Sequence, residues 1–183
     1  MRIAIFCLLA MSLKAYPREY RDPLKEFYFE FDEEKWQIVP PRTGEKTDID
    51  KQFAEQTLVN VQRIKSDDKY HSRFSVVLEK ADGGEGPLDA RLTKYGEKAR
   101  DFLEKQRFYV FSGKLVTFSG IKAFDIIANQ RDFGLMFHQR VLLRGKDAYL
   151  LTAATRTKKF EEQEAEVDKM LDSFRFYGKS VAR

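Results

Sequence analysis

Histidines are the residues in this chain best suited to acid–base or metal chemistry, and there are only two, His71 and His138. A catalytic zinc ion generally takes three protein ligands and a structural zinc four, so carboxylates would have to complete any site. No Gly-x-Ser-x-Gly turn is present to supply a hydroxyl nucleophile. We therefore predict no catalytic residue. A small hydrolase or metal-dependent enzyme using His71 and His138 is the alternative, and it requires the two side chains to lie close together.

Carboxylates are so numerous, at 29 Asp and Glu, that a pair is easy to find by chance. The Glu-rich segment 161–166 falls in the first turns of a predicted helix, where negative charge complements the helix dipole. Neither Asp67-Asp68 nor the loop with Asp82 has the ligand spacing of a calcium loop. The glycines of residues 81–87 match neither the dinucleotide fingerprint nor a P-loop. We predict no cofactor and no resident metal.

Basic residues slightly outnumber acidic ones, with 33 Lys and Arg and a formal net charge of +4. They are interspersed with acids rather than clustered, which argues against a nucleic acid partner. The tract Arg156, Lys158 and Lys159 comes nearest to a patch, and we interpret it as the solvated entry to a helix.

A second group of basic residues falls on a predicted strand over residues 135–143. Because side chains alternate along a strand, His138 shares its face with Met136, Arg140 and Leu142. A modest positive surface could be formed by His138, Arg140 and Arg144. We expect this surface to contact a partner and assign it no other role.

Residues 1–15 have the organisation of a secretory signal peptide: Arg2 precedes nine apolar residues, and the segment ends at Ala15. The apolar run is about half of the ~20 residues that cross a bilayer, so we expect no transmembrane anchor after processing. Cleavage after Ala15 and after Ser12 both remain open. A buried N-terminal strand of a cytosolic protein is the competing interpretation.

The single cysteine, Cys7, lies inside this segment. Only six residues precede it and Phe6 is bulky, which argues against lipidation. Processing would remove Cys7 and lower the formal net charge to +2. A mature chain without cysteine suits an oxidising compartment, so we predict a secreted or periplasmic protein.

The elements that must position these residues are mostly strands. Residues 26–31 alternate, with Phe27, Phe29 and Phe31 on one side, as in a half-buried strand. Trp36 follows as a packing anchor. Further strand-like runs are separated by short turns, which favours antiparallel neighbours; they cover residues 58–64, 74–78, 108–111, 115–118, 123–131, 135–143 and 148–155.

Two segments have helical periodicity, residues 88–106 and residues 160–174. The apolar stripe of the first consists of Leu88, Leu92, Tyr95, Ala99, Phe102 and Leu103. The sequence therefore predicts an α+β domain with a mainly antiparallel sheet flanked by helices. We assign residues 16–26 to an N-terminal lead-in, 27–177 to one domain and 178–183 to a C-terminal tail.

The order of elements resembles the PsbP-like superfamily, which includes the photosystem extrinsic subunit PsbP, Ran-binding Mog proteins and bacterial DcrB-like envelope proteins. The segments that carry the resemblance are residues 27–41, 88–106, 120–123, 139–143, 148–153 and 160–174. The resemblance implies an α/β/α sandwich and usually no catalytic residues.

These observations together predict an exported, non-enzymatic binding or accessory protein of the cell envelope. Its partner would be another envelope protein or a small ligand. Besides the hydrolase, a second alternative is a carrier of an apolar small molecule, because sixteen Phe could line a cavity as well as fill a core.

Overall fold

The computed structural model describes residues 17–40, 55–66, 70–81 and 85–177. The predicted signal peptide with Cys7, the C-terminal tail, Asp67-Asp68 and Asp82 lie outside the described residues.

A seven-stranded antiparallel sheet is the central layer of the fold, with strand order β3-β4-β5-β9-β8-β7-β6. Strands β6 to β9 form a meander of consecutive hairpins, and β5 pairs along its whole length with β9. The strands are β3 (Trp36–Val39), β4 (Thr57–Arg63), β5 (Arg73–Lys80), β6 (Tyr109–Phe118), β7 (Ile121–Gln130), β8 (Leu135–Arg144) and β9 (Asp147–Arg156).

A second sheet has three strands in the order β1-β2-β10, namely β1 (Arg18–Asp22), β2 (Phe27–Phe31) and β10 (Arg175–Phe176). Residues 18–22 therefore form a strand of the domain, not part of a lead-in. Tyr20 explains this, because its ring packs against Phe27 and Phe29 at centroid distances of 6.0 and 5.4 Å. The turn into β2 is held by Asp22, whose Oδ1 accepts the backbone N–H groups of Leu24 and Lys25.

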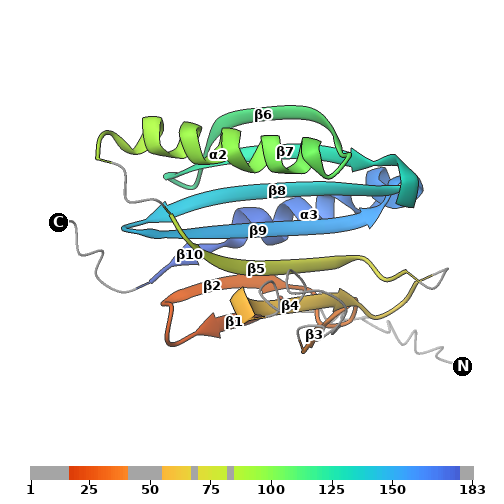
Figure 1. The fold of residues 1–183 in the computed structure, drawn as a ribbon. Helices are drawn as coiled ribbons and strands as arrows, with labels where there is room; N and C mark the ends of the chain where they lie inside the picture. The colour runs from red at the N-terminus through yellow and green to blue at the C-terminus, as the bar shows by residue number, and fades with distance from the viewer. Residues whose placement is uncertain (1–16, 41–54, 67–69, 82–84, 178–183) are drawn as a thin grey trace, which may run out of the picture.

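Two helices lie on opposite faces of the large sheet (Figure 1). Helix α2 (Leu88–Lys105) covers β6, β7 and β8, where Phe124, Ile126 and Val141 form a core beneath it. Helix α3 (Phe160–Ser173) packs with the small sheet against the other face. The larger core there contains Phe27, Phe29, Trp36, Phe74, Leu151 and Phe174 among others. The α+β prediction is confirmed.

Two details of the sequence prediction need correction. The two runs expected at 108–111 and 115–118 form one strand, β6, which begins at Tyr109, passes through Gly113 and has a register shift between Val110 and Ser112. The expected helical stripe also includes Phe102, which is exposed, whereas Gly96 faces the sheet and is buried. Helix α2 lies so close to β7 at this glycine that a Cβ there would be 2.1 Å from Cγ of Phe124.

Candidate functional site

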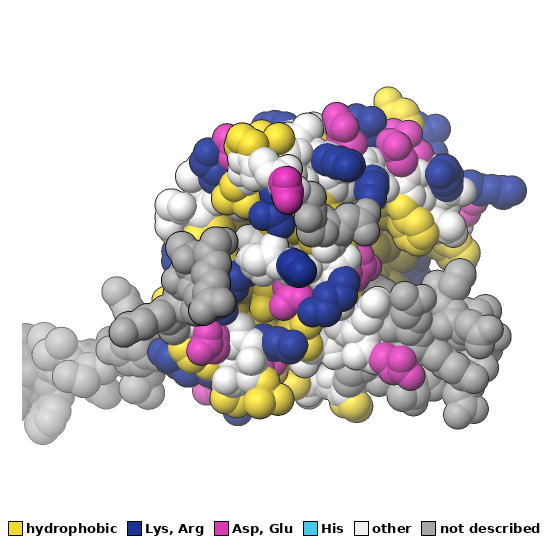
Figure 2. Space-filling model, turned by 60° about the vertical axis from the view of Figure 1, so that its left-hand side comes forward, with side chains coloured by type: hydrophobic (Ala, Val, Ile, Leu, Met, Phe, Trp, Pro, Cys, Tyr) yellow, Lys and Arg dark blue, Asp and Glu magenta, His cyan; other side chains and the backbone are white. Residues whose placement is uncertain are grey.

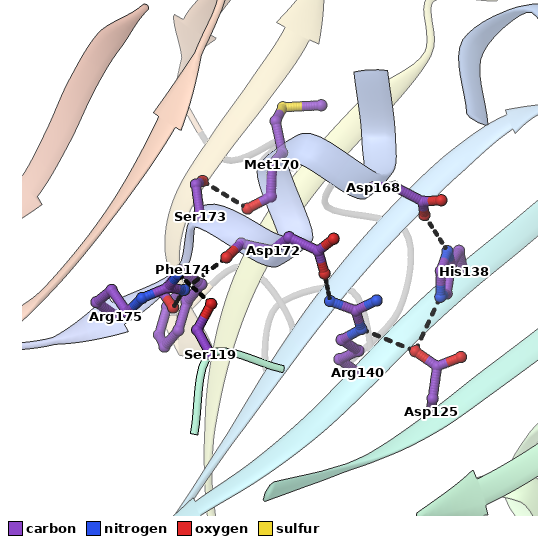
Figure 3. A network of polar contacts seen from close by, with 10 residues as sticks. All are labelled: Ser119, Asp125, His138, Arg140, Asp168, Met170, Asp172, Ser173, Phe174 and Arg175. Carbon is purple, nitrogen blue, oxygen red and sulfur yellow. Dashed lines mark hydrogen bonds and ion pairs between the residues drawn. The ribbon is translucent and has the colours of Figure 1, made fainter. Parts of the chain in front are cut away.

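A group of charged side chains lies between the large sheet and α3 (Figure 3). Asp125 on β7 and His138 and Arg140 on β8 point to the face that α3 covers, as strand alternation requires. Asp125 lies directly opposite Arg140 in the strand register. Asp168 and Asp172 come from α3, and their spacing of four residues places them on one side of the helix.

One carboxylate oxygen is at the centre of this polar network. Oδ1 of Asp125 accepts hydrogen bonds from Nε2 of His138 and from Nε of Arg140, each at 2.9 Å. Nδ1 of His138 lies 3.2 Å from Oδ1 of Asp168, and the guanidinium of Arg140 also binds Asp172. His138 thus lies between Asp125 and Asp168, and Arg140 lies between Asp125 and Asp172.

Burial makes these interactions strong. Asp125 and His138 are each only 6% exposed. Burial alone would raise the pKa of Asp125, but hydrogen bonds and charges from His138 and Arg140 outweigh it and hold that pKa below its ordinary value. For Arg140, burial opposes the charged form, while Asp172 and Asp125 favour it and raise the pKa of the guanidinium. The pair is therefore ionised and mutually neutralised.

The chemistry open to this network is limited because its charged side chains bind mainly one another. A carboxylate that orients a histidine is a component of catalytic dyads, but catalysis also needs a nucleophile or a substrate within reach of the ring. Both ring nitrogens of His138 face carboxylates, and no hydroxyl or thiol of the described residues bonds to either. Nor do the described residues include a cluster of three or more His, Cys, Asp or Glu able to hold a metal.

The structure does not bring His71 and His138 together. Nδ1 of His71 is bonded to the carbonyl oxygen of Arg63 at 2.8 Å, remote from the polar network. His138 lies opposite Ala153, and Ala153 lies opposite Phe74, which is three residues from His71. Two strand spacings and three residues of rise correspond to about 14 Å between the backbones. A shared site of the two histidines has no geometric support.

Arg144 is placed apart from the network as well. Its guanidinium binds the carboxylate of Glu26 at 2.8 Å and lies 5.0 Å from the ring centroid of Phe176. It therefore attaches the small sheet to β8. Since His138 and Arg140 are covered by α3 and paired with acids, the three residues do not form the open positive surface that the sequence suggested.

A basic pocket at the start of α3 was not predicted. Its volume is about 130 Å³. Arg63, the last residue of β4, and Lys65, two residues beyond it, bring two cations to the tract Arg156, Lys158 and Lys159. The tract alone indicated a solvated helix entry. Arg63 and Lys65 lie about ninety positions earlier in the chain than the tract, so no local pattern could connect them with it.

Comparisons with known proteins give a fold but no sequence relative. No protein-family model and no curated protein sequence matches this chain. Among solved structures, cyanobacterial PsbP (CyanoP) from Synechocystis matches 89% of this chain and 94% of its own, with a TM-score of 0.64 and 12% identity.

Two bacterial structures match over similar lengths. LpqN of Mycobacterium tuberculosis, described as involved in cell envelope biogenesis, covers 92% of this chain and 88% of its own, with a TM-score of 0.55 and 10% identity. PA94 of Pseudomonas aeruginosa, a protein of unknown function, covers 90% of this chain and 99% of its own, with a TM-score of 0.55 and 13% identity. The chain has the PsbP-like fold. At these identities the PsbP-like match establishes architecture, and the function has to come from the residues themselves.

The surface of the domain carries charges of both signs. No helix within the described ranges is long and apolar enough to span a membrane. Figure 2 shows one face, on which basic and acidic side chains intermix without forming a patch of one sign.

Proposed function

We propose that the protein is an exported, non-enzymatic binding or accessory protein of the cell envelope. The observation that carries the non-enzymatic part is the internal pairing of Asp125, His138 and Arg140. These residues bind one another and α3. Such a network fixes α3 on the sheet, because the buried charges of Asp125 and Arg140 neutralise each other and Arg140 also binds Asp172 on the helix.

Export is supported by the N-terminal segment and, more weakly, by the fold. Residues 1–15 have the charge and apolar pattern of a signal peptide, and a structure of the same fold is described as involved in cell envelope biogenesis. Another envelope protein or a small ligand is the partner that this role requires.

The experiment is expression of the full chain in a bacterial host followed by fractionation and mass spectrometry of the N-terminus. We expect a periplasmic or secreted form that begins at Tyr16 or Leu13. A chain that stays in the cytoplasm with Met1 retained would overturn export. Turnover of chromogenic esters or phosphoesters by the purified protein that His138→Gln abolishes without unfolding it would overturn the non-enzymatic assignment.

A further inference from the structure

Among the residues that the structure describes, the basic pocket is lined by five cations and one carboxylate. Lys65 and Lys158 form no ion pair with any described residue, while Lys159 binds Glu162 at 2.9 Å and Arg63 binds Glu166 at 2.9 Å. Its lining is Arg63, Lys65, Ser66, Tyr70, Ser72, Arg156, Lys158, Lys159, Glu162 and Gln163. Cations gathered around a concave space attract an anion, because the surrounding protein concentrates their field there.

The floor of the pocket carries a buried amide. Gln163 is 6% exposed, and its Oε1 accepts a hydrogen bond from the hydroxyl of Ser72 at 2.6 Å. The other end of this amide, the donor Nε2, has no hydrogen-bond partner among the described residues. Nε2 is not among the fully buried polar atoms that lack a partner, so this donor stays within reach of solvent and of a ligand that enters the pocket.

The pocket also lies at the start of α3, at the right-hand end of the view in Figure 1, where β9 runs into the helix. No side chain caps this fourteen-residue helix at its N-terminal residue Lys159. The 3₁₀ turn Thr157–Lys159 leads directly into the helix, and the N–H of Phe160 donates to the carbonyl oxygen of Thr157. The partial positive charge at this end of the helix dipole still favours phosphate and other anions.

We propose that this pocket binds a phosphate group. A phosphate monoester carries a charge of about −1.5 to −2 and three acceptor oxygens, which suits several cations and an amide donor better than a carboxylate does. A volume of about 130 Å³ is well below the roughly 300–1,000 Å³ of drug-sized pockets. The pocket therefore holds the phosphate group and leaves the rest of the ligand outside.

The phosphate could belong to a small soluble molecule or to a lipid headgroup. The inference deepens the proposed binding role by naming the ligand chemistry, but it does not depend on export. Failure to bind phosphate would leave the fractionation and turnover results unchanged, so the two proposals fail separately.

The test uses the purified protein and three probes: inorganic phosphate, glycerol 3-phosphate, and vesicles of phosphatidylcholine with or without phosphatidic acid. Binding is followed by NMR shifts of backbone amides at constant ionic strength, and for vesicles by co-sedimentation. We expect saturable shifts at residues 157–163 on titration with phosphate up to about 20 mM, a range that includes weak millimolar sites. Binding of the soluble probes alone identifies a soluble ligand, whereas co-sedimentation that requires phosphatidic acid identifies a lipid headgroup.

Matched variants make the test specific. Lys65→Gln with Lys158→Gln should weaken phosphate binding about tenfold or more, because the two cations without ion pairs are lost. Lys94→Gln with Lys146→Gln removes the same charge from exposed positions outside the pocket and should change the affinity less than about twofold.

A third variant probes the floor. Gln163→Glu keeps the shape of the side chain and its acceptor for Ser72, but replaces the donor with a negative charge, so phosphate binding should be lost while circular dichroism is unchanged. The proposal is overturned if none of the probes binds, or if binding is equal in the wild type, Lys65→Gln with Lys158→Gln, and Gln163→Glu.

Discussion

Asp125→Asn tests how much the polar network stabilises the fold. Asp125 accepts hydrogen bonds from His138 and from Arg140, each at 2.9 Å, and is almost fully buried. Asparagine keeps the shape and an acceptor oxygen but removes the charge. Breaking a fully buried ion pair costs about 3–5 kcal/mol, and a hydrogen bond to a charged group contributes about 1.5–3 kcal/mol. Since Arg140 retains Asp172, we expect the free energy of unfolding to fall by about 2–4 kcal/mol.

The pH dependence of this effect has a definite sign. The folded-state pKa of Asp125 is below its ordinary value because the hydrogen bonds and charges of His138 and Arg140 outweigh burial. Its contribution to stability is therefore fully present above the unfolded-state pKa of about 3.9 and is lost as the pH falls through the lower folded-state pKa. The difference between wild type and Asp125→Asn should be large near pH 5.5 and should shrink as the pH is lowered below about 4.

Urea unfolding followed by circular dichroism at several pH values measures both quantities. Asp172→Asn is the matched control, because that side chain is 56% exposed and an exposed ion pair contributes only about 0–1 kcal/mol. A loss below about 0.5 kcal/mol for Asp125→Asn, or a loss that does not change between pH 5.5 and 3.5, would refute the account of the network.

Three further substitutions test the packing of the layers. Gly96→Ala should destabilise the protein by about 1–3 kcal/mol in thermal or urea unfolding, although alanine has the better helix propensity, because its Cβ would overlap Phe124. The cost should be smaller in a protein that also carries Phe124→Leu. An equal cost in that background would contradict the overlap. Phe29→Ala should cost about 3–5 kcal/mol by the same measurement, because that ring is fully buried among aromatic rings; a cost below 1 kcal/mol would show that the two sheets do not share a core. Glu166→Gln should cost about 1–2 kcal/mol and lower the midpoint in urea, because the carboxylate accepts from Lys35, Arg63 and Trp36; an unchanged midpoint would show that these contacts contribute nothing.

Local periodicity was enough to predict most of the fold. Alternation identified β2, and helical spacing placed α2 over residues 88–106 against the observed Leu88–Lys105. Short turns between strands correctly indicated an antiparallel sheet. Strand β1 was missed because its sequence, Arg-Glu-Tyr-Arg-Asp, has one apolar ring, and the partner that buries it follows only after the turn.

The polar network could not be predicted, because it depends on the register between β7 and β8 and on where α3 lies. One signal was present in the sequence: Asp125 interrupts the apolar run from Ala123 to Ile127, and a charge in a buried strand needs a partner. His138 and Arg140 were noticed for their positive charge, but strand alternation indicates only which side chains share a face. It cannot indicate whether that face is open or covered.

Helix α3 connects the two polar regions of the molecule. On one flank Glu166 binds Lys35 and Arg63, and on the other Asp168 and Asp172 face His138 and Arg140. The buried side of the helix, with Gln163 and Met170, lies between these flanks. Charges therefore fix the helix from both sides while the core fixes it from below.

The polar network around Asp125 holds α3 in place, whereas the basic pocket is the proposed binding site. The pocket needs α3 in place, because its residues come from β4, β9 and the start of the helix. A ligand that binds only the folded state must stabilise that state, by about 2.7 kcal/mol at one hundred times its dissociation constant. Phosphate should therefore raise the melting temperature of Asp125→Asn by mass action as it does that of the wild type, but not that of Gln163→Glu. The same shift in all three proteins would mean that phosphate acts as a general stabilising salt and not through the pocket.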